Sequence, residues 1–237
     1  MRLFAAVAAV AALLAAPALA QEASVEEIVV TGSRMIEWDP DDIPAVQLFR
    51  RADNLIAEVR VVNDTREAAG RRDELTRTLR AMARSAAGRA DIDLSIEEEG
   101  VLVPLTEDMV STLTLGFDGS RSDTSVAALI VKTPVRADDT LDSASGRLED
   151  FIEAVQPVGR SLADISGDWQ LSIVDPPQYR SAILGLIAAD ARQASAAFGP
   201  GYSVQVTGIE SRVTWRQSGP LDLGLFIPYT LTVVPTP

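Results

Sequence analysis

The stretch LIAEVRVVNDTREAAGRRDELTRTLRAMARSAAG (residues 55–88) decides the fold, because its hydrophobic period changes along its length. Its first part alternates between apolar and polar residues, as in a strand with one buried face. From residue 65 to residue 87 the apolar residues recur every three or four positions, as on one face of a helix. Asp64 and Glu67 have the spacing of a capping box, and Gly88 follows the last apolar position. The apolar positions are Ala57, Val59 and Val61 in the strand and Leu75, Leu79, Met82 and Ala86 in the helix.

The same order of strand then helix returns at 126–156 and at 169–198. Asp139 or Thr140 is the predicted cap of the second helix, and Asp175 followed by Pro176 that of the third. Further strands are predicted at 27–34, 92–96, 112–117, 202–207 and 229–233. Strands that alternate cleanly bury only one face. We therefore predict an α+β fold, with a mainly antiparallel sheet and about three amphipathic helices packed on one face.

Residues 1–20 have the layout of a secretory signal peptide. Arg2 supplies a positive start, residues 3–14 are an unbroken apolar run, and Pro17 precedes a small-x-small site at 18–20. A run of about 12 residues is shorter than the roughly 20 that a membrane-spanning helix needs. We expect export to the periplasm and a mature chain without a transmembrane segment. That chain divides into an N-terminal strand and acidic loop (21–44) and one domain (45–237).

The chain contains no cysteine and no histidine, and these absences exclude several classes of chemistry. Without cysteine there is no disulfide, thiolate zinc site or thiol nucleophile. Without histidine there is no Ser-His-Asp triad and no imidazole metal ligand. The classes of chemistry that remain are carboxylate catalysis, a Ser-Lys arrangement built on Lys132, and hard cations such as calcium held by Asp and Glu. We predict no catalytic residue, no metal and no cofactor. A net charge of −13 with a single lysine, Lys132, also disfavours nucleic acid, which needs clustered basic residues.

Residues 27–34, with the sequence EIVVTGSR, resemble the N-terminal signature of TonB-dependent outer-membrane receptors, which includes the energy-coupling box. Such a receptor needs a plug and a barrel of about 22 strands. A chain of 237 residues is several hundred residues too short for that fold. The resemblance leaves open that the protein is a periplasmic accessory of TonB-dependent transport, with this segment as a docking strand.

The order and spacing of the elements resemble the SIMPL-domain family of secreted bacterial envelope proteins. Its opening strand, I-x-V-T-G-x-G, is similar to residues 28–34, where Arg34 replaces the second glycine. A strand and an Ala-rich helix follow at 55–87, and residues 187–196 (IAADARQASA) are the nearest match to a later A-x-x-D-A-R-x-x-A helix. The acidic insert at 37–44 departs from the pattern. The resemblance implies a non-enzymatic protein of the periplasm or outer membrane that self-associates. In some members the family is linked to stress tolerance.

Two interaction surfaces are predicted from the sequence. One is a docking strand formed by Ile28, Val29, Val30 and Thr31, which is able to extend another protein's sheet. The other combines Trp215 with the apolar residues Leu221, Leu223 and Phe226, because an exposed apolar run indicates a partner or an oligomer contact. The predicted function is binding or self-assembly, as a homo-oligomer or with an envelope partner. A carboxylate-dependent hydrolase, which requires two acids facing each other across a cleft, remains an alternative.

Overall fold

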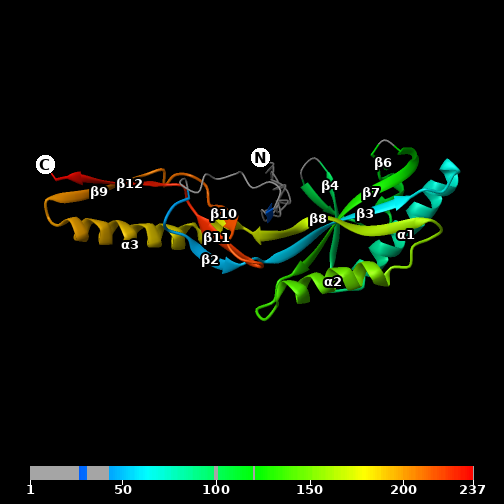
Figure 1. Cartoon of the computed structure of the whole chain (residues 1–237), viewed down its shortest axis with the longest axis horizontal. Helices are drawn as coiled ribbons and strands as arrows, with labels where there is room; N and C mark the ends of the chain where they lie inside the picture. Colours follow the sequence, from blue (N-terminus) through cyan, green and yellow to red (C-terminus); the bar gives the residue numbers. More distant parts are fainter. Residues whose placement is uncertain (1–26, 31–42, 99–100, 120, 237) are drawn as a thin grey trace, which may run out of the picture.

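The chain forms an elongated molecule with a body at one end and an arm at the other (Figure 1). The computed structural model describes residues 27–30, 43–98, 101–119 and 121–236. The predicted signal peptide, Thr31 and the acidic loop as far as Asp42 lie outside the described residues. The described part has three helices and mostly antiparallel sheets, so the α+β prediction is confirmed.

The body is built on a seven-stranded sheet in which the strand pairings are antiparallel. The strand order is β1-β8-β3-β7-β4-β5, and β6 pairs with β7 beside this path. The predicted strand at 112–117 is wrong in part, because a 3-10 turn, η3 (Met109–Thr112), overlaps its start and only its end pairs in β6. The strands are β1 (Glu27–Val30), β3 (Asn54–Asn63), β4 (Asp93–Glu98), β5 (Val101–Pro104), β6 (Gly116–Asp118), β7 (Arg121–Pro134) and β8 (Ser161–Val174).

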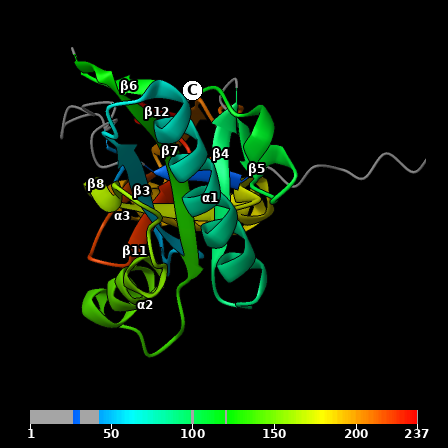
Figure 2. The ribbon, with the colours of Figure 1, turned by 90° about the vertical axis from the view of Figure 1, so that its right-hand side faces the viewer.

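Two helices cover one face of this sheet. Both α1 (Ala68–Ala87) and α2 (Leu141–Ala154) contact β3, β7 and β8. The alternation in β3 explains the choice of face, since Val59 is buried whereas Glu58, on the opposite face, is exposed. Figure 2 views the molecule along its long axis, with the body in front and the arm behind it. The core between helices and sheet is filled by fully buried side chains: Ala57, Val61, Leu75, Leu79, Met82, Leu148 and Phe151.

Capping agrees with the sequence at α2 and differs at α1. Thr140 caps α2, because its hydroxyl accepts a hydrogen bond from Ser143 N at 3.2 Å while Ser143 Oγ accepts one from Thr140 N at 2.9 Å. The predicted capping box at α1 is wrong. Glu67 is the N-cap residue without a side-chain hydrogen bond, and Asp64 instead pairs with Arg160 at 2.6 Å.

A small three-stranded sheet joins the body to the arm. Its order is β10-β11-β2, with β2 (Leu48–Arg51), β10 (Thr214–Gln217) and β11 (Asp222–Phe226), and both pairings are antiparallel. β2 leads into β3 after only Ala52 and Asp53. One nearly continuous stretch of chain therefore links the small sheet to the main sheet. None of these three strands was among the predicted elements.

The arm consists of α3 (Arg180–Phe198) packed on a two-stranded ribbon of β9 (Tyr202–Thr207) and β12 (Thr230–Pro235). The third helix was predicted on the same sheet face as the other two, and its place in the arm differs from that prediction. After β8, Asp175 adopts a φ of 48° and a 3-10 turn, η4 (Pro176–Tyr179), precedes α3. The left-handed residue and the two prolines turn the chain away from the main sheet before α3 begins.

Candidate functional site

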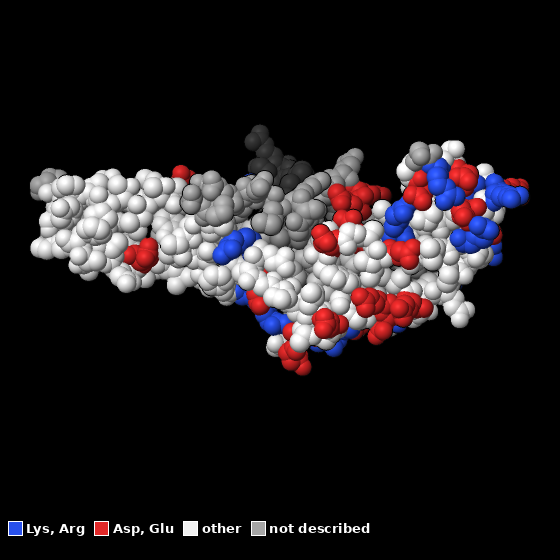
Figure 3. All heavy atoms as spheres, in the orientation of Figure 1, with Lys and Arg blue, Asp and Glu red and all other residues white. Residues whose placement is uncertain are grey.

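The arm is almost free of charged side chains, although the whole chain has a net charge of −13. From the start of α3 to the end of β9 the charged residues are Arg180, Asp190 and Arg192, and β12 has none. Figure 3 shows the contrast on one face, where charged side chains crowd the body and the arm is almost entirely white. The arm is therefore the part of the molecule that another acidic protein, including a second copy, can approach with the least repulsion.

The helix of the arm has large apolar residues that the described chain covers only in part. Only Ile183 and Ile187 of α3 are buried, whereas Leu186 is 40% exposed and Phe198 is 57% exposed. Phe198 forms a tilted pair with the half-exposed Tyr202 at the tip of the arm, with ring centroids 6.0 Å apart. A helix that is apolar around most of its circumference is normally buried. The exposed residues of α3 include many small ones, among them Ala182, Gly185, Ala189, Ala196 and Ala197.

The ribbon of the arm has two unprotected edges. Among the described residues this sheet contains only β9 and β12, so each strand has one edge without a neighbouring strand from that part of the chain. Proteins usually protect such edges with charges, prolines or bulges. The main sheet follows that rule. β5 ends at Pro104. β8 has two exposed charges, Asp164 and Asp168, beside a register shift where Gly167 has a φ of 76°. By contrast, β9 and β12 pair without a register shift and contain no charge.

Polar contacts at its base hold the arm in place. The guanidinium group of Arg180, at the start of α3, donates to the carbonyl oxygens of Ser211, at 2.5 Å, and Ile209. The guanidinium of Arg50 lies over the ring of Tyr179, 4.4 Å from its centroid. These contacts tie the start of the arm helix to the loop before β10 and to β2, so the exposed side of α3 is presented in a fixed direction.

The predicted docking strand is paired within the main sheet. In β1, Ile28 lies opposite Ile173, Val29 opposite Ser172 and Val30 opposite Leu171 of β8. Three of its four residues are therefore paired with β8 along one edge, as the end strand of the main sheet, and do not form a free segment. The fourth residue, Thr31, lies outside the described residues.

The predicted exposure of the segment after Trp215 is wrong. Leu221 is 3% exposed, and Leu223 and Phe226 are 0% exposed. The reason is that β11 is the central strand of the small sheet, with both edges paired and both faces covered. Trp215 itself is half-buried in β10, opposite Leu225, and packs against the core. These residues form the interior of the small sheet and not a free contact surface.

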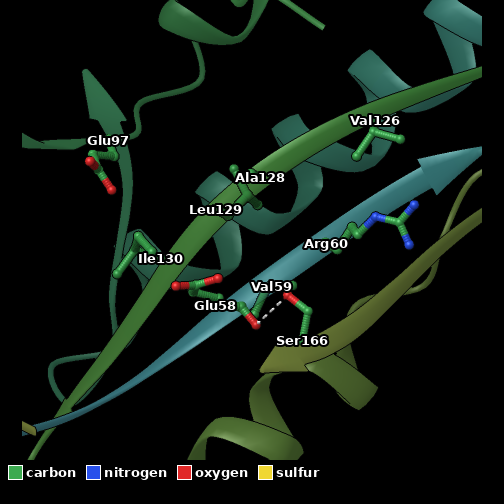
Figure 4. Close-up of a pocket in the computed structure, with 9 residues that line it drawn as sticks. All are labelled: Glu58, Val59, Arg60, Glu97, Val126, Ala128, Leu129, Ile130 and Ser166. Atoms are coloured by element: carbon green, nitrogen blue, oxygen red, sulfur yellow. Dashed lines mark hydrogen bonds between the residues drawn. The ribbon is translucent and has the colours of Figure 1, made fainter. Parts of the chain in front are cut away.

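The open face of the main sheet has a shallow hollow of about 360 Å³. Two carboxylates, Glu58 of β3 and Glu97 of β4, line it with the side chain of Ile130 between their strands (Figure 4). Glu58 is already engaged, because its Oε1 accepts a hydrogen bond from Gln170 Nε2 at 2.9 Å and its carbonyl oxygen accepts one from Ser166 Oγ at 3.4 Å. Glu58 and Glu97 line the same hollow, and a hydrolase would need them to face each other across it.

The carboxyl groups with clearly shifted pKa values lie away from this hollow. They are Asp64, Glu74 and Asp139, and the pKa of each is lowered. A hydrogen bond from the Thr65 hydroxyl is the largest cause of the Glu74 pKa of about 2. The largest cause of the lowered pKa of Asp139 is the pair of hydrogen bonds that the Arg147 guanidinium donates to its carboxylate, at 2.6 and 2.7 Å. Each lowered pKa marks a charged acceptor in a structural network, whereas a general acid needs a raised pKa.

No group of three or more acidic residues suited to a metal ion is found among the described residues. Sequence reasoning missed the exposed apolar residues of the arm, Leu186, Phe198, Tyr202 and Ile209. The sequence does show a run without charged residues, from Gln193 to Ile209, but residues 223–237 also lack charge and include most of the buried strand β11. An uncharged run alone therefore does not distinguish an exposed arm from a core.

Within the part of the chain that the structure describes, none of the helices combines the length and apolar character needed to cross a bilayer. Comparisons with known protein families, with curated proteins and with solved structures find no match.

Proposed function

We propose that the mature protein is a non-enzymatic protein of the periplasm or cell envelope that acts by self-assembly through its arm. The observation behind this proposal is the uncharged arm, with its exposed apolar side chains and two open strand edges, projecting from a charged body. The resemblance to the SIMPL-domain family implies the same mode of action and a role in envelope stress tolerance.

Physical chemistry favours the arm over the body as the contact. Copies of a chain with a net charge of −13 repel each other, and contacts between the bodies would add to that repulsion. A helix packed on two strands also buries little apolar surface, and isolated two-stranded ribbons are marginally stable. Covering the arm would therefore stabilise the arm and the assembly together.

The alternative of a TonB-linked accessory has less support, because Ile28, Val29 and Val30 pair with β8. A free docking strand would first have to leave the main sheet. The hydrolase alternative rests on Glu58 and Glu97 alone, and Glu58 is held by Gln170.

Size-exclusion chromatography with light scattering on residues 21–237 tests the proposal, and we expect a discrete oligomer. Replacing Phe198 with aspartate places a negative charge at the tip of each arm, so the oligomer should dissociate. Phe117→Asp is the matched control, because Phe117 is 63% exposed on β6 of the body, compared with 57% for Phe198. A monomeric wild-type protein, or equal effects of the two substitutions, would contradict the proposal.

A further inference from the structure

The outer edge of β12 carries backbone hydrogen-bonding groups that no described strand pairs. Thr236 N donates to Gly201 O at 2.9 Å, which shows that the backbone of residue 236 points toward β9. In an antiparallel ladder successive residues point alternately toward and away from the partner strand. Counting back from Thr236, the N–H and C=O groups of Leu231 and Val233 therefore point away from β9, to the open edge.

We infer that β12 pairs with β12 of a second copy, joining two ribbons into one continuous four-stranded antiparallel sheet. This inference rests on the proposed self-assembly and specifies its geometry. A two-fold axis through Thr232 sets Leu231 of each copy opposite Val233 of the other, which satisfies four backbone groups per copy. It also places Thr232 of one copy directly opposite Thr232 of the other, at a non-hydrogen-bonded position between these two pairs.

The choice of β12 over β9 follows from the position of the helix. α3 packs mainly against β9, and in Figure 1 it lies on the β9 side of the ribbon, so β12 has the edge farther from the helix. β12 has no charged residue that would repel a second copy, and its one proline, Pro235, stands at the end of the strand.

The choice of a second copy as the partner follows from charge. β12 runs outward from the junction to the C-terminal tip of the arm (Figure 1). Antiparallel pairing therefore sets the two charged bodies at opposite ends of the joined arms. The 19 residues of α3 span roughly 28 Å, well beyond the Debye length of about 8 Å at physiological salt. The repulsion between the bodies is screened, and the uncharged arms meet.

Single-cysteine variants test the register, because the chain has no cysteine of its own. Thr232→Cys sets two sulfurs across a pair whose Cα atoms are about 4.5 Å apart, within the range for a disulfide. Thr230→Cys is the matched control, since both threonines are exposed on the face of the ribbon away from α3. In the proposed dimer the two residues at position 230 would lie roughly 14 Å apart along the strands, too far for a disulfide. Under mild oxidation we expect a covalent dimer on non-reducing gels from Thr232→Cys and none from Thr230→Cys.

Two proline variants test which edge is used. Val233 and Val204 are cross-strand partners, both half-buried, and the N–H of each points away from the ribbon. Val233→Pro removes an N–H donor from the β12 edge, and Val204→Pro removes one from the β9 edge. Both variants exchange the same valine side chain for proline. We expect Val233→Pro to weaken the dimer about tenfold or more, because each interface loses two hydrogen bonds, and Val204→Pro to leave it unchanged by light scattering.

The outcomes separate this inference from the proposed function. If the wild-type protein is an oligomer but Thr232→Cys does not cross-link, or if Val204→Pro is the variant that dissociates, the pairing through β12 is wrong and self-assembly stands. If the wild-type protein is a monomer, both fail.

Discussion

Replacing Leu223 with alanine distinguishes a core strand from a contact surface. Leu223 is 0% exposed in β11, the central strand of the small sheet. Losing three buried carbons costs about 2.4 kcal/mol at roughly 0.8 kcal/mol each. The cavity left behind brings the expected loss in the free energy of unfolding to about 3–5 kcal/mol. In a protein of this size that loss lowers the Tm by roughly 6–20 °C.

Urea unfolding followed by tryptophan fluorescence measures this loss, with Trp215 as a reporter in the neighbouring strand β10. Leu162→Ala is the matched control, because Leu162 is 57% exposed on β8. The same chemical change there should cost less than about 1 kcal/mol. The oligomer mass should stay the same in both variants.

The reasoning is refuted if the two variants lose the same stability while Leu223→Ala alone lowers the oligomer mass. That pattern would mean that β11 is a contact surface and that its burial in the small sheet contributes little to folding.

Three further predictions concern the networks of the body. Asp139→Asn should lower the free energy of unfolding by about 1–3 kcal/mol, because the poorly exposed Arg147 loses its charged partner and keeps only neutral acceptors such as Thr133 Oγ1 and Pro134 O. Asp138→Asn, at an exposed neighbour, should change it by less than about 0.5 kcal/mol in the same urea assay. The Glu74 pKa of about 2 lies below its ordinary 4.5, so the stabilising effect of the charged carboxylate is complete above pH 4.5 and is lost toward pH 2. The difference in the free energy of unfolding between wild type and Glu74→Gln should shrink over that range. A difference that grows on acidification would contradict the assignment. Gly159 has a φ of 60°, and Gly159→Ala places a Cβ 2.2 Å from the Glu74 carboxyl carbon, so this variant should lower the Tm. Gly167→Ala, also at positive φ but with open space around the new Cβ, should lower the Tm less. Equal shifts in the two melting curves would rule out the steric part of the argument.

The sequence determined the elements whose side chains alternate or recur within a few residues. The strand at 54–63, the helices α1 and α2, and the cap at Thr140 follow from such local patterns. The α+β class followed too, because a strand that alternates cleanly has only one face to bury.

Tertiary structure alone decided where those elements pack. Residues 221–226 look like an exposed apolar run until β2 and β10, distant in sequence, pair on either side of β11. The place of α3 depends on a left-handed residue, Asp175, which sends the helix out beside β9 and β12. The candidate site was missed for the same reason: an uncharged segment has the same composition in a core as on an arm. Only the three-dimensional arrangement shows that the described chain covers the large apolar residues of α3 only in part, because burial depends on neighbours far apart in the sequence.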